Sequence, residues 1–202
     1  MAGSLSMLSI AQIGFTPVAE IVLETNRLVL RTIDEGDAEL QDRVLNTPAV
    51  MQQLGGVKEL HEIEAKHAKS MQLFAREGFS FLFMIEKVTG EMVGHCGIKR
   101  VDHPKAPNQG DHEIGWLVRE DRWRQGYAEE AIRAVLDWAF GRVGAPLVVA
   151  LTNKANIGSW KLMEKLGMQR RKDLDFTDGE MGSDDDLLIQ YSLTKTQWEN
   201  AR

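Results

Sequence analysis

The feature that most constrains the fold is a predicted strand that runs through a short basic turn into a long amphipathic helix. The strand is HEIGWLV, residues 112–118, and the turn after it contains Gly126. Apolar residues then recur every three or four positions as far as Phe140, as they do on one face of a helix. These positions are Ala128, Ala131, Ile132, Val135, Leu136 and Ala139. Such a unit is typical of a protein in which helices pack on a sheet.

The start of this helix predicts an anion site. The first N–H groups of a helix lack partners and carry a partial positive charge. Gly126 brings no side chain into this region, and Arg122 and Arg124 add positive charge. These features favour a phosphate group, although glycine also occurs at such turns for backbone reasons alone, and the arginines could simply be solvated. The turn lacks the Gly-Lys-Ser/Thr ending of a Walker loop, and it is not a three-glycine dinucleotide fingerprint because Gly126 stands alone.

Most other segments also alternate between strands and helices. We predict strands at residues 27–33, 79–85, 92–101, 146–152, 168–176 and 186–194, and helices at 37–44, 59–78 and 156–167. No repeat or low-complexity linker divides the 202 residues. We therefore expect residues 24–202 to form one domain and residues 1–23 to be a flexible N-terminal lead. The expected fold is a mixed α/β (α+β) sandwich with a central twisted sheet and helices on both faces.

Composition argues against several functions. The net charge of −6 is unlike that of a nucleic-acid binder and suits a cationic partner better. No run of about 18 apolar residues predicts a membrane span, and the first residues lack the basic start of a secretory signal. Cys96 is the only cysteine, which excludes an internal disulfide and favours the cytoplasm. His61 and His67 lack the spacing of a helical metal site, so we expect no metal.

The stretch EIGWLVREDRWRQGYAEEAIRAVLDWAF, followed by NIGSWKLMEKLGM, resembles the GNAT superfamily of N-acetyltransferases. It is most similar to the Rim-type branch, which includes the ribosomal-protein N-terminal acetyltransferases. The family's phosphate loop is Gln/Arg-x-x-Gly-x-Gly/Ala; Gly126, Tyr127 and Ala128 match its end, and Trp123 replaces its first residue. The opening LETNRLVLRTIDEGDAE and the closing YSLTKTQWEN extend the resemblance over nearly the whole chain. The resemblance implies a three-layer GNAT sandwich whose central mixed sheet contains a splayed pair of strands.

The resemblance also implies binding roles, with acetyl-CoA as the acyl donor. Backbone N–H groups of residues 124–128 would hold its pyrophosphate, and residues 116–118 would pair with its pantetheine arm. The gap between that strand and residues 147–152 would admit the thioester. Asn156 and Ser159 would lie beside it, although the residues alone suit a helix cap and a solvated serine. The set expected at the coenzyme is Trp116, Leu117, Val118, Arg122, Trp123, Arg124, Gln125, Gly126, Tyr127, Ala128, Asn156 and Ser159.

Acyl transfer from a thioester to an amine places three demands on the site. A base must take the proton of the amine, a donor must stabilise the tetrahedral oxyanion, and the leaving thiolate needs a proton. For the base we select Glu113, acting through water, ahead of His112 and His95. A backbone N–H of the splayed strand, at Val118 or a neighbour, is the expected oxyanion donor.

The acid is the point at which the chain departs from the family. The family often has a tyrosine just before a Glu-Lys pair in the last helix, and Met163 occupies that position here. Methionine has no proton to donate. Ser159 is the alternative acid, because the Rim-type branch places a serine close to the coenzyme sulfur. Cys96 is expected to be an inert buried thiol, since the family transfers the acyl group directly.

We therefore predict an enzyme that transfers an acetyl group from acetyl-CoA to a primary amine through a tetrahedral intermediate. The acceptor stays open between a protein N-terminus and a small cationic molecule, and a homodimer is expected only by analogy. The acidic run Ser183–Asp186 either attracts a cation or is a solvated surface. Two other classes remain open. One is a catalytically degenerate acyl-CoA sensor, which the missing tyrosine favours, and the other is a phosphate-binding protein unrelated to coenzyme A.

Overall fold

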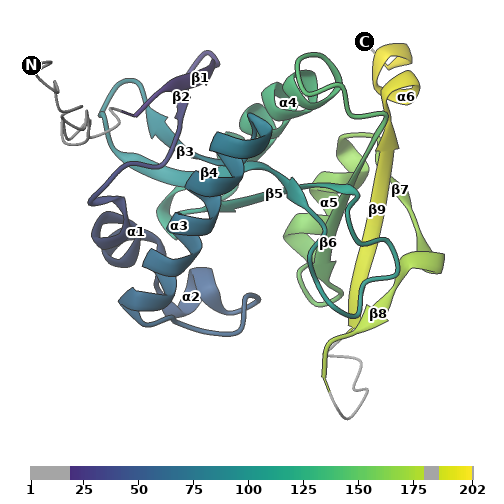
Figure 1. Ribbon diagram of the computed structural model, residues 1–202, viewed down its shortest axis with the longest axis horizontal. Helices are drawn as coiled ribbons and strands as arrows, with labels where there is room; N and C mark the ends of the chain where they lie inside the picture. The colour runs from purple at the N-terminus through teal and green to yellow at the C-terminus, as the bar shows by residue number, and fades with distance from the viewer. Residues whose placement is uncertain (1–18, 180–186, 202) are drawn as a thin grey trace, which may run out of the picture.

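The computed structural model describes residues 19–179 and 187–201, in which a large sheet carries helices on both faces (Figure 1). The strands are β1 (Ile21–Glu24), β2 (Leu28–Arg31), β3 (Phe81–Glu86), β4 (Met92–Arg100), β5 (His112–Val118), β6 (Leu147–Asn153), β7 (Gln169–Arg170), β8 (Phe176–Thr177) and β9 (Leu187–Thr194). The helices are α1 (Asp37–Leu45), α2 (Pro48–Met51), α3 (Leu60–Glu77), α4 (Tyr127–Phe140), α5 (Ile157–Lys165) and α6 (Lys195–Asn200), with the 3-10 turns η1 (Glu120–Arg122) and η2 (Lys172–Leu174).

The sheet runs in the order β1-β2-β3-β4-β5-β6-β9-β7, and β8 also pairs with β9. Neighbouring strands are antiparallel except for β5 and β6, which are parallel. These two strands pair only at His112–Val148 and Glu113–Val149, close to where each begins, and their later residues are not paired with one another. Along their other sides, both strands stay paired from end to end, with β4 and β9 respectively. The expected mixed sheet with a splayed central pair is confirmed.

Helices cover the two faces of this sheet in a three-layer arrangement. On one face α4 packs on β4 and β5, and its Ile132 and Leu136 are fully buried in the main core. On the other face α1 packs against α3 and β4, around the smaller core of Leu45, Phe83 and Met92. Figure 1 shows α1, α2 and α3 gathered on one side of the strands. The sheet therefore separates the two groups of helices.

The helix boundaries follow from local chemistry. The side chain of Glu59 caps the start of α3 while Glu62 bonds back to the backbone of Glu59, which forms a capping box. Gly78 ends α3 in the left-handed conformation, with φ 74°. Asn156 caps α5 by accepting a hydrogen bond from the N–H of Ser159. The expected ends of these helices are thus present in the fold.

Two parts of the chain differ from the predicted pattern. β1 pairs with β2 and begins at Ile21, inside the segment that we assigned to the N-terminal lead. The single strand predicted at 168–176 is wrong, because β7 and β8 are short strands separated by η2. The chain turns there because Arg170 binds Asp175 through two contacts of 2.7 and 2.5 Å. The acidic run at 183–186 lies outside the described residues.

Among the residues that the structure describes, no helix combines the length and the apolar character needed to cross a bilayer. The longest helix, α3, has 18 residues but carries several charged side chains. Its polar composition suits a helix that lies on a sheet with one face toward water.

Candidate active site

The open edge of β5 is the first element of the site. The N–H of Arg119 donates to the carbonyl of Val93 (2.9 Å), which sets the odd-numbered residues of β5 to bond with β4. Backbone groups of successive strand residues point to opposite sides. Trp116 therefore directs both of its backbone groups toward the gap beside β6, and Val118 directs its N–H there, since its carbonyl already accepts a hydrogen bond from Trp123. Leu117 directs its own toward β4, so it offers the gap no free backbone group.

The turn between β5 and α4 presents a run of unpaired N–H groups. The indole Nε1 of Trp123 donates to the carbonyl of Val118 (2.7 Å) and folds the turn back over the end of β5. Arg124 and Gly126 both adopt the left-handed conformation, with φ 59° and 82°. Within residues 19–179 and 187–201, no N–H from 124 to 128 donates to a protein acceptor. These donors lie at and just before the N-terminus of α4, where a helix favours negative charge.

The two predicted arginines of the turn differ in their surroundings. Arg122 pairs with Asp121 (2.7 Å) and also approaches Glu86 and Glu91 (3.5 Å each). Its charge is therefore already balanced within the protein. Arg124 is exposed and makes no ion pair among the described residues. Of the two, Arg124 is the cation that is available to an incoming anion.

Arg27 lies beside the same turn, although sequence reasoning did not select it. Its Nη1 donates to the carbonyl of Gln125 (2.9 Å), and its Nε pairs with Glu130 of α4 (2.6 Å). A Cβ added to Gly126 would lie 3.4 Å from the Nη2 of Arg27. Arg27 thus braces the turn from the side of β2. No sequence signal could have found it, because its partners lie about a hundred positions later in the chain.

The side chains of three other predicted residues point into the protein or along the turn. Tyr127 is buried, and its hydroxyl donates to Glu86, which raises the pKa of Tyr127 and lowers that of Glu86. Ala128 packs against the main core. Gln125 donates its side-chain amide to the carbonyl of Asp121 (2.7 Å). These three residues can serve a bound anion only through their backbone.

Glu113 lies where β5 and β6 begin to diverge. It faces Lys99 across the β4–β5 ladder, and the Nζ of Lys99 lies 3.3 Å from its carboxylate. Burial raises the pKa of Glu113, and the positive charge of Lys99 opposes this rise. The side chain is only 14% exposed. A carboxylate with a raised pKa accepts a proton more readily, which is what a general base requires. Lys99 was not selected from the sequence.

The other two candidate bases are less well placed. His95 is enclosed by Phe81 and Phe83, and burial lowers its pKa to about 4. His112 contacts Phe79, and burial also lowers its pKa. Cys96, next to His95, is fully buried, and burial raises the pKa of its thiol. The cysteine is therefore an inert part of the core, as predicted.

The predicted residues of α5 are divided between surface and core. Asn156 Oδ1 accepts the N–H of Ser159 (3.3 Å), so this asparagine caps its helix. The side chain of Ser159 is half-buried and makes no protein hydrogen bond among the described residues. Met163, at the position of the family's tyrosine, is 1% exposed and belongs to the main core. Ser159 is thus the available hydroxyl of the two positions.

The family model for the acetyltransferase (GNAT) domain matches residues 27–169, which include all of these elements except the last strands. The chain belongs to the GNAT acetyltransferase family. It is 32% identical to the uncharacterised protein YkkB of Bacillus subtilis (strain 168) over 155 aligned residues. The aligned region covers 76% of this chain and 88% of YkkB. Membership in this family identifies the protein as an acetyltransferase, and the family predicted from the sequence is confirmed.

Solved structures of GNAT proteins share the fold. The acetyltransferase from Agrobacterium tumefaciens str. C58 has a TM-score of 0.66 at 26% identity and covers 89% of this chain and 97% of its own. An acetyltransferase from Salmonella typhimurium that modifies the N-terminal serine of ribosomal protein L7/L12 has a TM-score of 0.68 at 16% identity, with coverage of 87% and 99%. At that identity the likeness concerns the fold alone, so the Rim-type branch stays a prediction. Within the described ranges, no three His, Cys, Asp or Glu side chains group as metal ligands.

Proposed function

We propose that this GNAT protein transfers an acetyl group directly from acetyl-CoA to a primary amine. The observation that carries the proposal is the run of unpaired N–H groups at 124–128, which adjoins the open edge of β5. Such a run suits phosphate oxygens, and an open strand edge suits an amide-containing chain that binds as an added strand would. Coenzyme A carries its diphosphate and its pantetheine amides in that order along one molecule.

In the proposed reaction, residues of this chain act on the amine and on the developing charge. Glu113 takes the proton of the attacking amine, through a water molecule where the two are not in direct contact. The N–H of Val118 faces the gap and stabilises the tetrahedral oxyanion. Ser159 donates its hydroxyl proton to the leaving thiolate and recovers a proton from water, and Glu113 returns the proton of the amine to the solvent. The remaining rate enhancement comes from holding the amine against the thioester.

The finer assignments belong to the same proposal. A Rim-type relationship is supported by the opening and closing stretches of the sequence and by the fold shared with the Salmonella typhimurium enzyme. It would make a protein N-terminus one candidate acceptor beside small amines. One catalytic domain over residues 24–202, a cytoplasmic location and a homodimer are further parts of this proposal.

A thiol-release assay with acetyl-CoA and a panel of primary amines tests this function. Glu113→Gln should lower kcat by about 10²- to 10⁴-fold, the usual contribution of a general base, and leave the affinity for acetyl-CoA unchanged. Glu199→Gln, at an exposed carboxylate of α6, serves as the matched control. Full turnover by Glu113→Gln would remove this residue from the mechanism. Hydrolysis of acetyl-CoA without an amine would not support the enzyme.

The acyl-CoA sensor remains the second candidate, because Met163 is buried and cannot protonate a thiolate. A sensor would bind acetyl-CoA and release no thiol with any amine. Ser159→Ala separates the two cases further. In the enzyme it should lower turnover more than coenzyme affinity, whereas unchanged turnover would mean that the thiolate leaves without help from this residue.

A further inference from the structure

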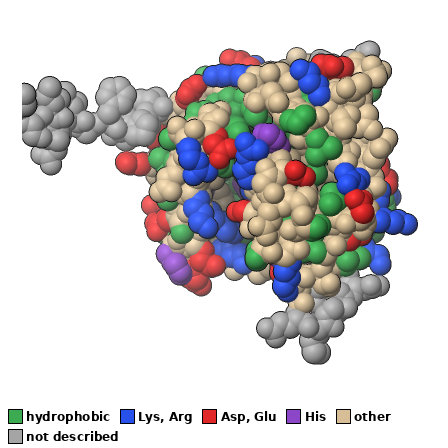
Figure 2. Space-filling view, turned by 45° about the vertical axis from the view of Figure 1, so that its right-hand side comes forward, with side chains coloured by type: hydrophobic (Ala, Val, Ile, Leu, Met, Phe, Trp, Pro, Cys, Tyr) green, Lys and Arg blue, Asp and Glu red, His purple; other side chains and the backbone are tan. Residues whose placement is uncertain are grey.

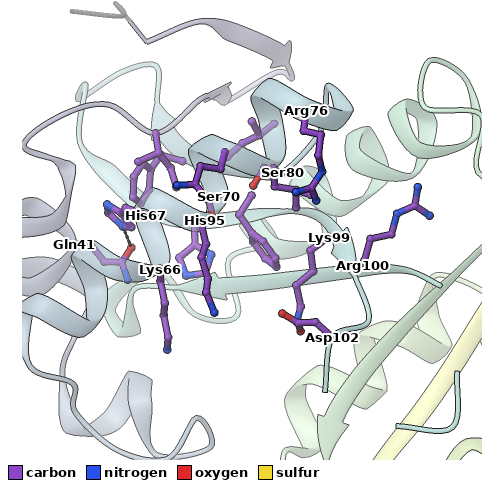
Figure 3. Close-up of a pocket in the computed structure, with 17 residues that line it drawn as sticks. Gln41, Lys66, His67, Ser70, Arg76, Ser80, His95, Lys99, Arg100 and Asp102 are labelled. Atoms are coloured by element: carbon purple, nitrogen blue, oxygen red, sulfur yellow. Dashed lines mark hydrogen bonds and ion pairs between the residues drawn. The ribbon is translucent and has the colours of Figure 1, made fainter. Parts of the chain in front are cut away.

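A cavity of about 640 Å³ lies between α3 and the face of β3 and β4 that is opposite α4. It opens on the surface that Figure 2 presents, where Lys and Arg side chains gather around a hollow. Its volume is in the range that holds small-molecule ligands. The close-up in Figure 3 shows Lys66, Ser70 and Arg76 reaching it from α3, and His95 and Lys99 from β4.

The charge of this cavity is one-sided. Its lining includes the five cations Lys66, Lys69, Arg76, Lys99 and Arg100 and a single acid, Asp102. Carboxylates balance some of these cations. Arg76 and Arg100 share Glu77 (2.9 Å each), and Lys99 binds Asp102 (2.5 Å) and Glu113 (3.3 Å).

Lys66 and Lys69 are not balanced in this way. Neither forms an ion pair with a carboxylate in the part of the chain that the structure describes. Burial lowers the pKa of Lys66, and the charges of Lys58, Lys99 and Lys69 lower it further, whereas the carboxylate of Glu62 opposes this fall. Crowded cations of this kind are stabilised when an anion comes between them. Among the described residues that line the cavity, Asp102 is the single carboxylate, and it is already paired with Lys99.

Polar atoms without partners point to a ligand in the same cavity. Ser80 lines it and is 1% exposed, and its hydroxyl has no hydrogen-bond partner among the described residues. The Nδ1 of His95, which also lines it, is buried and equally unpartnered. A buried polar group without a partner costs free energy, so such groups usually meet a ligand or water. The hydroxyl of Ser80 can donate to an anionic oxygen.

The cavity and the candidate base share one neighbour, Lys99. Lys99 lines the cavity and also contacts Glu113, so an amine at the carboxylate and an anionic group among the lysines lie on the same face of the sheet. Ile33, Leu73 and Phe81 supply an apolar wall between polar groups. We propose that the cavity binds small amines that also carry a carboxylate or phosphate group, as free amino acids do. This inference rests on the proposed function and specifies its acceptor.

The electrostatics distinguish this acceptor from a polyamine or an aminoglycoside. The acidic net charge of −6 belongs to the whole chain and suggested a cationic partner, but the charge at the cavity has the opposite sign. A molecule with several ammonium groups meets repulsion from Lys66 and Lys69, and one with an anionic group meets attraction. The single ammonium of an amino acid is accommodated by Glu113 and Asp102.

Three pairs of amines that differ only in charge test the proposal. Glycine, phenylalanine and glutamine are compared with glycinamide, phenylalaninamide and glutaminamide by calorimetric binding in the presence of coenzyme A, and by thiol release. At least one anionic member should bind about tenfold more tightly than its amide, as expected for charge-assisted hydrogen bonds. The Lys66→Glu, Lys69→Glu double variant should lose this preference. Arg142→Glu, at an exposed cation that does not line the cavity, should keep it.

The proposal is overturned if the amides or spermidine bind better, if no anionic amine binds, or if the double variant keeps the preference. Ser80→Ala provides a second measurement. It should weaken binding of the anionic amine without lowering the melting temperature, because the hydroxyl has no protein partner to lose. Binding of acetyl-CoA alone and thiol release summed over all amines report on the proposed function. The ratio within each pair reports only on the anion preference.

Discussion

Replacement of Gly126 by glutamate tests the coenzyme site most directly, because the chain provides a matched control. Gly126 and Gly36 are both N-caps of helices, and their φ angles are 82° and 85°. A side chain in this left-handed conformation costs about 1–2 kcal/mol at either position. For a protein of this size, that corresponds to a fall in melting temperature of about 2–8 °C. Both Gly126→Glu and Gly36→Glu should show this fall in melting temperature.

Only the change at Gly126 should affect coenzyme binding. A carboxylate about 4 Å from a phosphate charge is repelled by about 4 kcal/mol at the effective dielectric of a protein surface. Because Gly126 is exposed, we halve this figure to about 2 kcal/mol, which corresponds to about a 30-fold weaker affinity. The bulk of the side chain adds to this loss. Isothermal titration with acetyl-CoA measures it.

The comparison of Gly126→Glu with Gly36→Glu can also contradict the proposed coenzyme site. Equal affinities for acetyl-CoA in Gly126→Glu and Gly36→Glu would show that the pyrophosphate does not bind at the start of α4. Thermal shift with ATP and NAD as competitors distinguishes a coenzyme A site from a general phosphate site. Stabilisation by those nucleotides and not by acetyl-CoA would contradict the proposed ligand.

Two further predictions follow from the charges of the site. Because burial raises the pKa of Glu113, kcat, corrected for the fraction of neutral amine, should fall with decreasing pH in a limb that lies above the ordinary value of 4.5. Lys99→Met should move this limb to higher pH, and an unchanged limb would exclude Glu113 as the titrating base. Arg124→Gln should weaken acetyl-CoA binding about three- to tenfold at low salt, whereas Arg122→Gln should have a smaller effect. Titration calorimetry at two salt concentrations compares these variants, and a larger loss in Arg122→Gln would refute the assignment.

The coenzyme side of the site could be predicted from the sequence because its signals are local. The strand, the turn with Gly126 and the amphipathic helix occupy consecutive positions, and each feature has a direct structural meaning. The observed β5 has the predicted bounds of 112–118, and α4 ends at Phe140 as expected. The backbone N–H groups depend on the course of the chain and little on side-chain identity.

The acceptor side could not be predicted in the same way. Lys66 and Lys69 belong to α3, whereas Lys99 and Arg100 belong to β4, and nothing in either segment alone places them around one cavity. The bracing of the turn by Arg27 and the balancing of Arg122 by Glu86 likewise join distant positions. The prediction of one strand at 168–176 failed because the contact between Arg170 and Asp175 is a side-chain effect that overrides β-propensity.

The short pairing between β5 and β6 means that the protein is built with an unfinished ladder. In the free molecule, the amide protons of Trp116 and Val118 should exchange with solvent as quickly as those of an outer strand, although four strands lie on each side of β5. A ligand that binds between β5 and β6 as an added strand would join the two parts of the sheet and slow their separation. Part of the continuity of the sheet would then depend on the bound substrate. Release of the product would separate the later residues of β5 and β6 again at every catalytic cycle.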